Sequence, residues 1–186
     1  MGAITRGMGN SGISVISKQT VTNVSTVVFD LSTLDPNRAF NHHRLICNMG
    51  SVAANNNMHI QIGTGSNTYV TNANHMAYTR AGETAAGGTP TMHSTGGGGS
   101  FITWYTNSNG SATTINADII GLNQPSSNPA ANFARTYLIN GSNKTDLIYG
   151  VSRVNTGADY RFLRVLQYSG TNGINGDFTL LGIGGI

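Results

Sequence analysis

The residues of this chain that could carry chemistry are few, and its histidines are the first group to consider. The five histidines are His42, His43, His59, His75 and His93. A zinc site needs three or four converging ligands, usually including one closely spaced pair. His42 and His43 are adjacent, so a strand would turn them to opposite faces, whereas His59 and His75 could meet on neighbouring strands. No carboxylate motif accompanies them, and we expect no metal and no other cofactor.

Acidic side chains are also scarce. The seven are Asp30, Asp35, Glu83, Asp118, Asp146, Asp159 and Asp177. A glycosidase needs two carboxyl groups within about 5 to 10 Å of each other. Several of these residues stand beside turns, where an Asp accepts hydrogen bonds from backbone amides. We therefore expect that the protein is not an enzyme.

The pair Trp104-Tyr105 could form an aromatic platform for a sugar ring. On a strand the two side chains face opposite ways, so at most one could contact a ligand. They follow residues 81–100, a glycine-rich stretch without a strand pattern, and loops of that length are usually functional or disordered. The sequence thus offers Trp104, Tyr105 and His93 as a possible ligand or contact loop.

The N-terminal residues 1–12 contain four glycines and are predicted to form a flexible arm. Arg6 and Met8 are its candidate anchoring residues. The spacing of glycines in Gly7–Gly12 matches a dinucleotide fingerprint, but that site needs a helix after the glycines. The β-branched residues that follow from Ile13 favour a strand instead.

The composition indicates a strand-and-turn protein. Only 9% of the residues are charged, against roughly 25% in an average domain. Gly, Asn, Thr and Ser supply nearly half of the 186 residues. Gly and Asn accept the positive φ of tight turns, and Thr favours pleated surfaces. Cys47 is the single cysteine, beside Leu45 and Ile46, and is expected to be a small buried side chain.

Charge and hydropathy argue against nucleic-acid and membrane partners. The net charge is +3, yet no two basic residues are adjacent, so no basic patch is visible. No apolar run approaches the ~20 residues that span a bilayer. The first residues lack the apolar segment of a secretory signal, so synthesis in a cytoplasm is expected.

Period-two alternation predicts about ten short strands and almost no helix. The candidate strands are Ile13–Lys18, Val27–Leu31, Arg44–Met49, Met58–Ile62, His75–Arg80, Ser100–Thr106, Thr113–Ile120, Phe133–Ile139, Thr145–Val151, Tyr160–Tyr168 and Asp177–Ile183. Two short stretches, Ser32–Arg38 and Pro129–Ala134, are compatible with helix.

Turn residues connect these strands into an antiparallel arrangement. Asn-Gly, the dipeptide that best fits a type I′ hairpin turn, begins at Asn109, Asn140, Asn172 and Asn175. Many short strands without helical crossovers imply two antiparallel sheets packed face to face. We therefore predict an all-β, antiparallel two-sheet β-sandwich, jelly-roll-like, as a single domain over residues 13–186.

Several short motifs carry a family resemblance. They are the strand that runs into a turn over 114–126, the opening segments Val28–Leu34 and Arg44–Cys47, and the closing segments Arg164–Gly170, Ile174–Gly176 and Phe178–Ile183. Together they resemble the β-sandwich modules of tailed-bacteriophage virion proteins, especially those of aquatic phages. The resemblance covers residues 20–183. It departs at Tyr168, where a serine-like residue is usual, and at Leu181, where an aromatic residue is common.

The resemblance implies a virion location and partners among other capsid or tail proteins. The expected role is a head decoration or accessory protein held by protein–protein contacts. The alternative is a tail-associated receptor-binding module that recognises a host-surface glycan. Modules of this kind imply a homo-oligomer, with a trimer favoured. Phe178–Ile183 is apolar on both faces, as expected in the middle of a sandwich or at a subunit contact.

Overall fold

The structure is a computed structural model of the whole chain. It describes residues 12–34, 40–49, 56–70, 74–82, 91–98, 102–106, 113–139, 144–154, 156–167 and 173–184. Of these, residues 56–57, 74–82, 91–98, 102–106, 133–139 and 144–148 are described by their backbone alone.

The described chain consists of strands and turns, with no helix among these residues. The strands are β1 (Ile13–Val24), β2 (Thr26–Asp30), β3 (His42–Met49), β4 (Asn56–Gly65), β5 (Thr68–Tyr69), β6 (Asn74–Gly82), β7 (Thr91–Gly98), β8 (Ile102–Thr106), β9 (Thr113–Ile120), β10 (Ala130–Ile139), β11 (Lys144–Val154), β12 (Phe162–Gln167) and β13 (Ile174–Ile183). Consequently no helix that could cross a membrane occurs in the described part.

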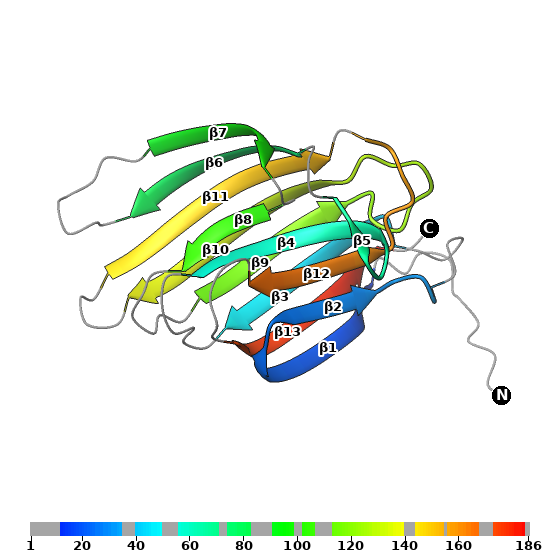
Figure 1. Cartoon of the computed structure of the whole chain (residues 1–186), viewed down its shortest axis with the longest axis horizontal. Helices are drawn as coiled ribbons and strands as arrows, with labels where there is room; N and C mark the ends of the chain where they lie inside the picture. Colours follow the sequence, from blue (N-terminus) through cyan, green and yellow to red (C-terminus); the bar gives the residue numbers. More distant parts are fainter. Residues whose placement is uncertain are drawn as a thin grey trace.

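The strands form two antiparallel sheets, which pack face to face (Figure 1). The larger sheet has eight strands in the order β1-β13-β3-β9-β10-β11-β6-β7. The smaller sheet has five strands, in the order β2-β12-β4-β5, with β8 also paired to β4. The predicted all-β, two-sheet sandwich is therefore confirmed.

The connectivity is that of a jelly roll with insertions. Setting aside β5 and the hairpins β6–β7 and β10–β11 leaves β1-β13-β3-β9 in one sheet and β2-β12-β4-β8 in the other. Two four-stranded sheets whose strands alternate in this way define the jelly roll. The inserted hairpins widen the larger sheet beyond β9, and β6 and β7 extend past the smaller sheet at the top of Figure 1.

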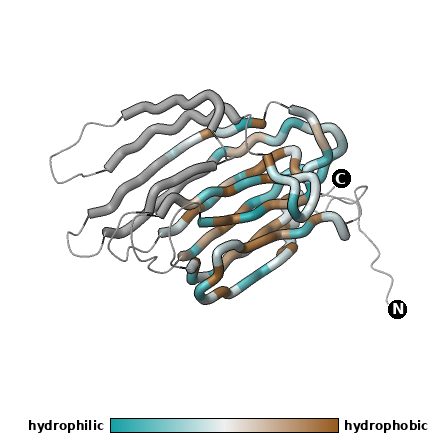
Figure 2. The backbone as a smooth tube through the Cα atoms, viewed as in Figure 1, coloured by the Kyte–Doolittle hydropathy of each residue, from teal (hydrophilic) through white to brown (hydrophobic). Residues whose placement is uncertain are grey.

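The core lies between the sheets. Hydrophobic and hydrophilic residues alternate along the strands, and the hydrophobic ones form this core (Figure 2). In β9, Ile115, Ala117 and Ile119 are buried, while the residues between them face outward. Phe29 and Phe178 are the largest fully buried side chains of the core. Burying an Ile, Leu or Phe side chain contributes roughly 2 kcal/mol. The same alternation that predicted the strands therefore also supplies the hydrophobic free energy that holds the sheets together.

The open side of the sandwich is closed where β1 passes into β2. Asn23, near the end of β1, has a φ of 56°, which lets the chain turn from one sheet to the other. Its backbone N–H donates to Asn175 Oδ1 at 2.8 Å, and its Oδ1 accepts from the Gly173 N–H at 3.2 Å. Gln19 Nε2 donates to the Val28 carbonyl at 2.8 Å and so links β1 to β2.

Several local expectations are wrong. The loop expected over 81–100 is not one loop, because residues 91–98 form β7, which pairs with β6. This strand is rich in glycine and is held by backbone hydrogen bonds. It shows no alternation of polar and apolar side chains, so the sequence pattern did not predict it. The helix-compatible stretch Pro129–Ala134 contributes to β10, since Ala130 already pairs with Ile120. Residues 83–90 and 35–39 lie outside the described residues.

The C-terminal pattern also differs from expectation. Asn175-Gly176 is not a hairpin turn, and Ile174–Gly176 is not a link, because both lie inside β13. Gly176 has a φ of 146°, and a Cβ there would lie 2.3 Å from the Asn48 carbonyl oxygen. Glycine is therefore required by the close approach of β3, and not by a turn.

Candidate interaction surface

The outer face of the larger sheet is the surface on which the described side chains gather most clearly. The strand registers align its outward positions into rows that cross six strands. One row holds Ile13, Ile183, His42, Ile120, Ala130 and Arg153; the next holds Val15, Leu181, Arg44, Asp118, Asn132 and Val151; a third holds Lys18, Thr179, Ile46, Asn116, Ala134 and Tyr149. Each row joins residues that are far apart in the sequence.

Apolar side chains on this face lie in two strips. The β1–β13 strip consists of Ile13 and Val15, which are 64% and 65% exposed, with half-buried Leu181 and Ile183 beside them. The β9–β11 strip consists of Ile120, Tyr149 and Val151, which are 56%, 55% and 52% exposed. Among the described residues, the one other large hydrophobic side chain with comparable exposure is Val28, on the opposite side of the sandwich. Exposed apolar side chains that gather in this way mark interaction sites.

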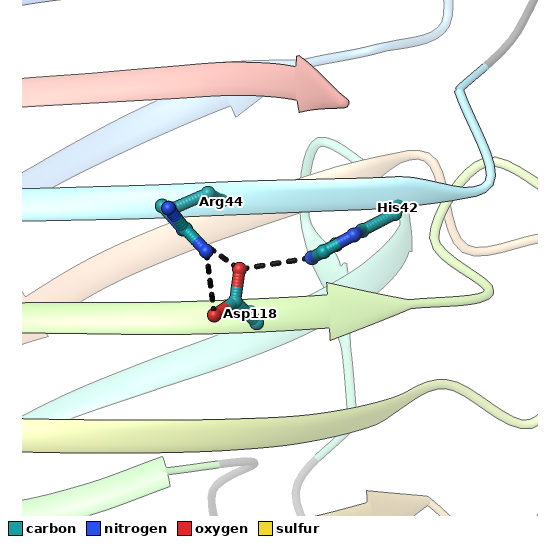
Figure 3. A network of polar contacts seen from close by, with 3 residues as sticks. All are labelled: His42, Arg44 and Asp118. Carbon is teal, nitrogen blue, oxygen red and sulfur yellow. Dashed lines mark hydrogen bonds and ion pairs between the residues drawn. The ribbon is translucent and has the colours of Figure 1, made fainter. Parts of the chain in front are cut away.

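A polar cluster of His42, Arg44 and Asp118 lies on the neighbouring strands β3 and β9 of this face (Figure 3). Asp118 on β9 accepts from Arg44 Nε at 2.8 Å and from Arg44 Nη2 at 3.1 Å, in a two-pronged ion pair across to β3. His42 Nε2, also on β3, lies 2.8 Å from the same Asp118 Oδ1. Both residues reach Asp118 because alternate positions of one strand share a face. The arrangement anchors a guanidinium and an imidazole at the centre of the face.

The charges of this cluster compensate each other. Partial burial raises the pKa of Asp118, but hydrogen bonds from Arg44 and His42 outweigh it, so the pKa of this carboxyl lies below its ordinary value. The hydrogen bond to Asp118 raises the pKa of the Arg44 guanidinium above its ordinary value. The pair is therefore ionised at neutral pH, and it presents a matched positive and negative charge on neighbouring strands.

His43, next to His42, points into the core as the strand geometry predicts. It is fully buried, and its ring meets Phe40 edge-on with ring centres 6.4 Å apart. Neither ring nitrogen has a hydrogen-bond partner among the described residues. Burial and the neighbouring His42 lower the pKa of His43 to about 4. The neutral ring therefore acts as a core side chain.

The outer face of the smaller sheet carries a different group. Arg164 on β12 donates to Gln61 Oε1 from Nε at 2.9 Å and from Nη2 at 2.6 Å. Its guanidinium carbon lies 3.7 Å from the centre of the Tyr69 ring. The alternation predicted for Met58–Ile62 is correct, yet Gln61 and His59 on the outward side are also buried.

The sequence-predicted contact residues belong to separate sheets. Trp104 and Tyr105 lie in β8 of the smaller sheet, opposite Met58 and Asn57 of β4. His93 lies in β7 of the larger sheet, opposite Tyr78. The side chains of all three are outside what the structure describes, as are Arg6 and Met8 of the predicted arm. The backbone thus does not place His93 and Trp104 in one loop.

The remaining candidate ligands are also distributed. His59 and His75, which the sequence allowed to meet on neighbouring strands, lie in β4 and β6 of different sheets. The four carboxylates with described side chains each have a partner of their own. Asp30 binds Ser32, Asp118 binds Arg44 and His42, Asp159 binds Arg161, and Asp177 binds Thr20. In the described part of the chain, no three His, Cys, Asp or Glu side chains are grouped as metal ligands.

The Arg44–Asp118 pair was missed by the sequence reasoning. The sequence pattern does place both residues at outward positions of predicted strands. It does not show that these strands are neighbours, because β3 and β9 are 74 residues apart at this contact.

Comparison of the chain with protein-family models, curated proteins and solved structures finds no match.

Proposed function

We propose that this chain is a non-enzymatic structural protein of a bacteriophage particle, held in the virion by protein–protein contacts. A head decoration or accessory protein is the preferred role. The observation that carries the proposal is the outer face of the larger sheet, with its two exposed apolar strips around an internally compensated ion pair. Such a face is suited to being covered by protein.

The fold and composition support this proposal in different ways. Jelly rolls are the fold of many viral capsid domains, although a fold alone does not define a function. The chain has only 9% charged residues, so molecules packed closely together would repel each other little. The resemblance of the closing segments to phage virion modules supplies the virion context.

The alternative is a tail-associated module that binds a host-surface glycan. Jelly rolls also occur in lectin domains, so the fold accommodates this role. Trp104 and Tyr105 are neighbours on β8, opposite Met58 and Asn57 of β4. Under this alternative, Trp104→Ala should abolish glycan binding, and retained binding would contradict it.

The deciding experiment is immunogold electron microscopy of intact virions, with an antibody raised against this chain. Label spread regularly over the head is expected. Label confined to the tail or its tip would overturn the decoration role in favour of receptor binding. Particles that carry no label, beside positive detection of the purified protein, would contradict a virion location altogether.

A further inference from the structure

We infer that the outer face of the larger sheet binds a second copy of this chain around a two-fold axis. The axis runs along the strands between β3 and β9. This inference deepens the proposed assembly role and rests on it, because it names the partner of the same face. The two-fold pair replaces the trimer that the sequence favoured.

The layout of the face makes it self-complementary. In the strand order β1-β13-β3-β9-β10-β11, a two-fold axis between β3 and β9 exchanges the left and right halves. β1 and β13 of one copy then face β11 and β10 of the other. Val15 meets Val151 and Ile183 meets Ala130, whereas Ile13 lies opposite Arg153 and Ile120 opposite His42. The exposed Ile13, Val15, Tyr149 and Val151 all become covered.

Charge is complementary under the same rotation. Arg44 and Asp118 lie directly opposite each other on β3 and β9, so the axis passes between them. Arg44 of one copy therefore meets Asp118 of the other, and four alternating charges surround the axis. In the third row, the same exchange sets Lys18 against the Tyr149 ring, a favourable cation–aromatic contact.

The area is sufficient for a specific contact. Six strands about 4.8 Å apart, each offering about 20 Å of length, give roughly 600 Å² per copy. Two copies would bury roughly 1,200 Å² in total, the lower end of the standard range for stable interfaces. Sheets that pack face to face cross at about 30°, so contacts nearest the axis are the best matched.

The first test is the mass in solution, measured by light scattering coupled to size-exclusion chromatography. The wild-type chain should show twice the 19.5 kDa of one chain at tens of micromolar. Val151→Glu should give the single-chain mass, because it places a charge in the β9–β11 strip. Val28→Glu is the matched control, since Val28 is exposed on the outer face of the smaller sheet and should leave the doubled mass unchanged.

The inference would be overturned by a wild-type monomer throughout the concentration range, by a wild-type mass of three chains, or by a doubled mass that survives Val151→Glu. Circular dichroism of each variant is the check that it has folded. Loss of the doubled mass in Val28→Glu alone would place the contact on the other sheet and would equally overturn it.

A second test locates the axis with a short bismaleimide cross-linker. Cys47, the native cysteine, is fully buried, so introduced cysteines are the ones that react. Asn116→Cys lies on β9 beside the axis and should cross-link to itself between copies. Val15→Cys lies on β1, and its two copies would be roughly 24 Å apart at a strand spacing of about 4.8 Å, so it should not. The reverse pattern would contradict an axis between β3 and β9.

The result of the mass and cross-linking tests can be distinguished from the result of the virion labelling. A chain that labels the virion head but stays monomeric overturns the two-fold pair and leaves the proposed function standing, with another virion protein as partner of the face. If the purified chain forms the pair but the antibody labels no virion, the two-fold pair stands and the proposed virion location is contradicted.

Discussion

At the scale of single residues, His43 links the stability of the core to pH. Its pKa is lowered to about 4 in the fold, whereas the unfolded chain takes up a proton near 6.5. The unfolded state therefore binds more protons between these values, and the free energy of unfolding falls as the pH drops through this window. The loss amounts to about 3 kcal/mol when the window has been crossed.

Replacing His43 by leucine should remove that part of the acid sensitivity. Urea unfolding of wild type and His43→Leu at pH 7 and pH 4, at one constant protein concentration, provides the comparison. Burial also lowers the pKa of His59, so His43→Leu should retain a smaller dependence on pH. An unchanged difference between the two pH values in the variant would contradict this account.

Gly182 makes a second prediction at this scale, through its contact with Phe40. A Cβ at Gly182 would lie 2.1 Å from Phe40 Cδ2, far inside contact distance. Gly182→Ala should therefore destabilise the fold by about 1–3 kcal/mol, the usual cost of overpacking. Thermal unfolding measures the loss, and the double variant Phe40→Ala/Gly182→Ala should lose less stability than the sum of the two single variants. Gly12→Ala is the control, because a Cβ there meets no atom within 4 Å.

At the scale of elements, the passage from β1 to β2 depends on Asn23. Its φ of 56° is readily adopted by Gly or Asn but strained for a β-branched residue. Asn23→Val should lose about 2 kcal/mol, from strain and from the hydrogen bond to Gly173. Asn23→Gly should lose less, since it keeps the backbone conformation and removes only that hydrogen bond. Equal losses in the two variants would show that φ is not what matters here.

Strands in which polar and apolar residues alternate clearly were predictable from the sequence. Strands without such alternation were not. The bounds Thr113–Ile120 match β9, and the predicted hairpin strands Phe133–Ile139 and Thr145–Val151 pair with each other in β10 and β11. β7 was not predicted because its glycines show no polar–apolar alternation. The start of β10 was not predicted because Pro129, next to it, was read as part of a helix-compatible stretch. The Arg44–Asp118 pair could not be predicted for another reason. Which strands are neighbours in a jelly roll is set by topology and not by local sequence.

At the scale of the whole molecule, the proposed two-fold pair predicts a stability that depends on concentration. A partner that binds only the folded chain raises the apparent unfolding temperature by mass action. The midpoint should rise between about 1 and 100 µM for wild type and for Val28→Glu, and should stay constant for Val151→Glu. Scanning calorimetry or fluorescence melting curves at several concentrations would record this, and a constant wild-type midpoint would contradict the pair.

The position of β13 has a consequence for how the protein is made. This strand lies between β1 and β3, so the first strand of the sandwich has no neighbour in its sheet until the last strand has been synthesised. A nascent chain on the ribosome must therefore hold β1, with its exposed Ile13 and Val15, unpaired until β13 has emerged. Contacts between β1 and β13, such as that of Thr20 with Asp177, join residues 157 positions apart, and such distant pairing makes folding slow. A ribosome-stalled chain that ends before β13 should consequently be digested by protease within β1, whereas the released full-length chain should resist.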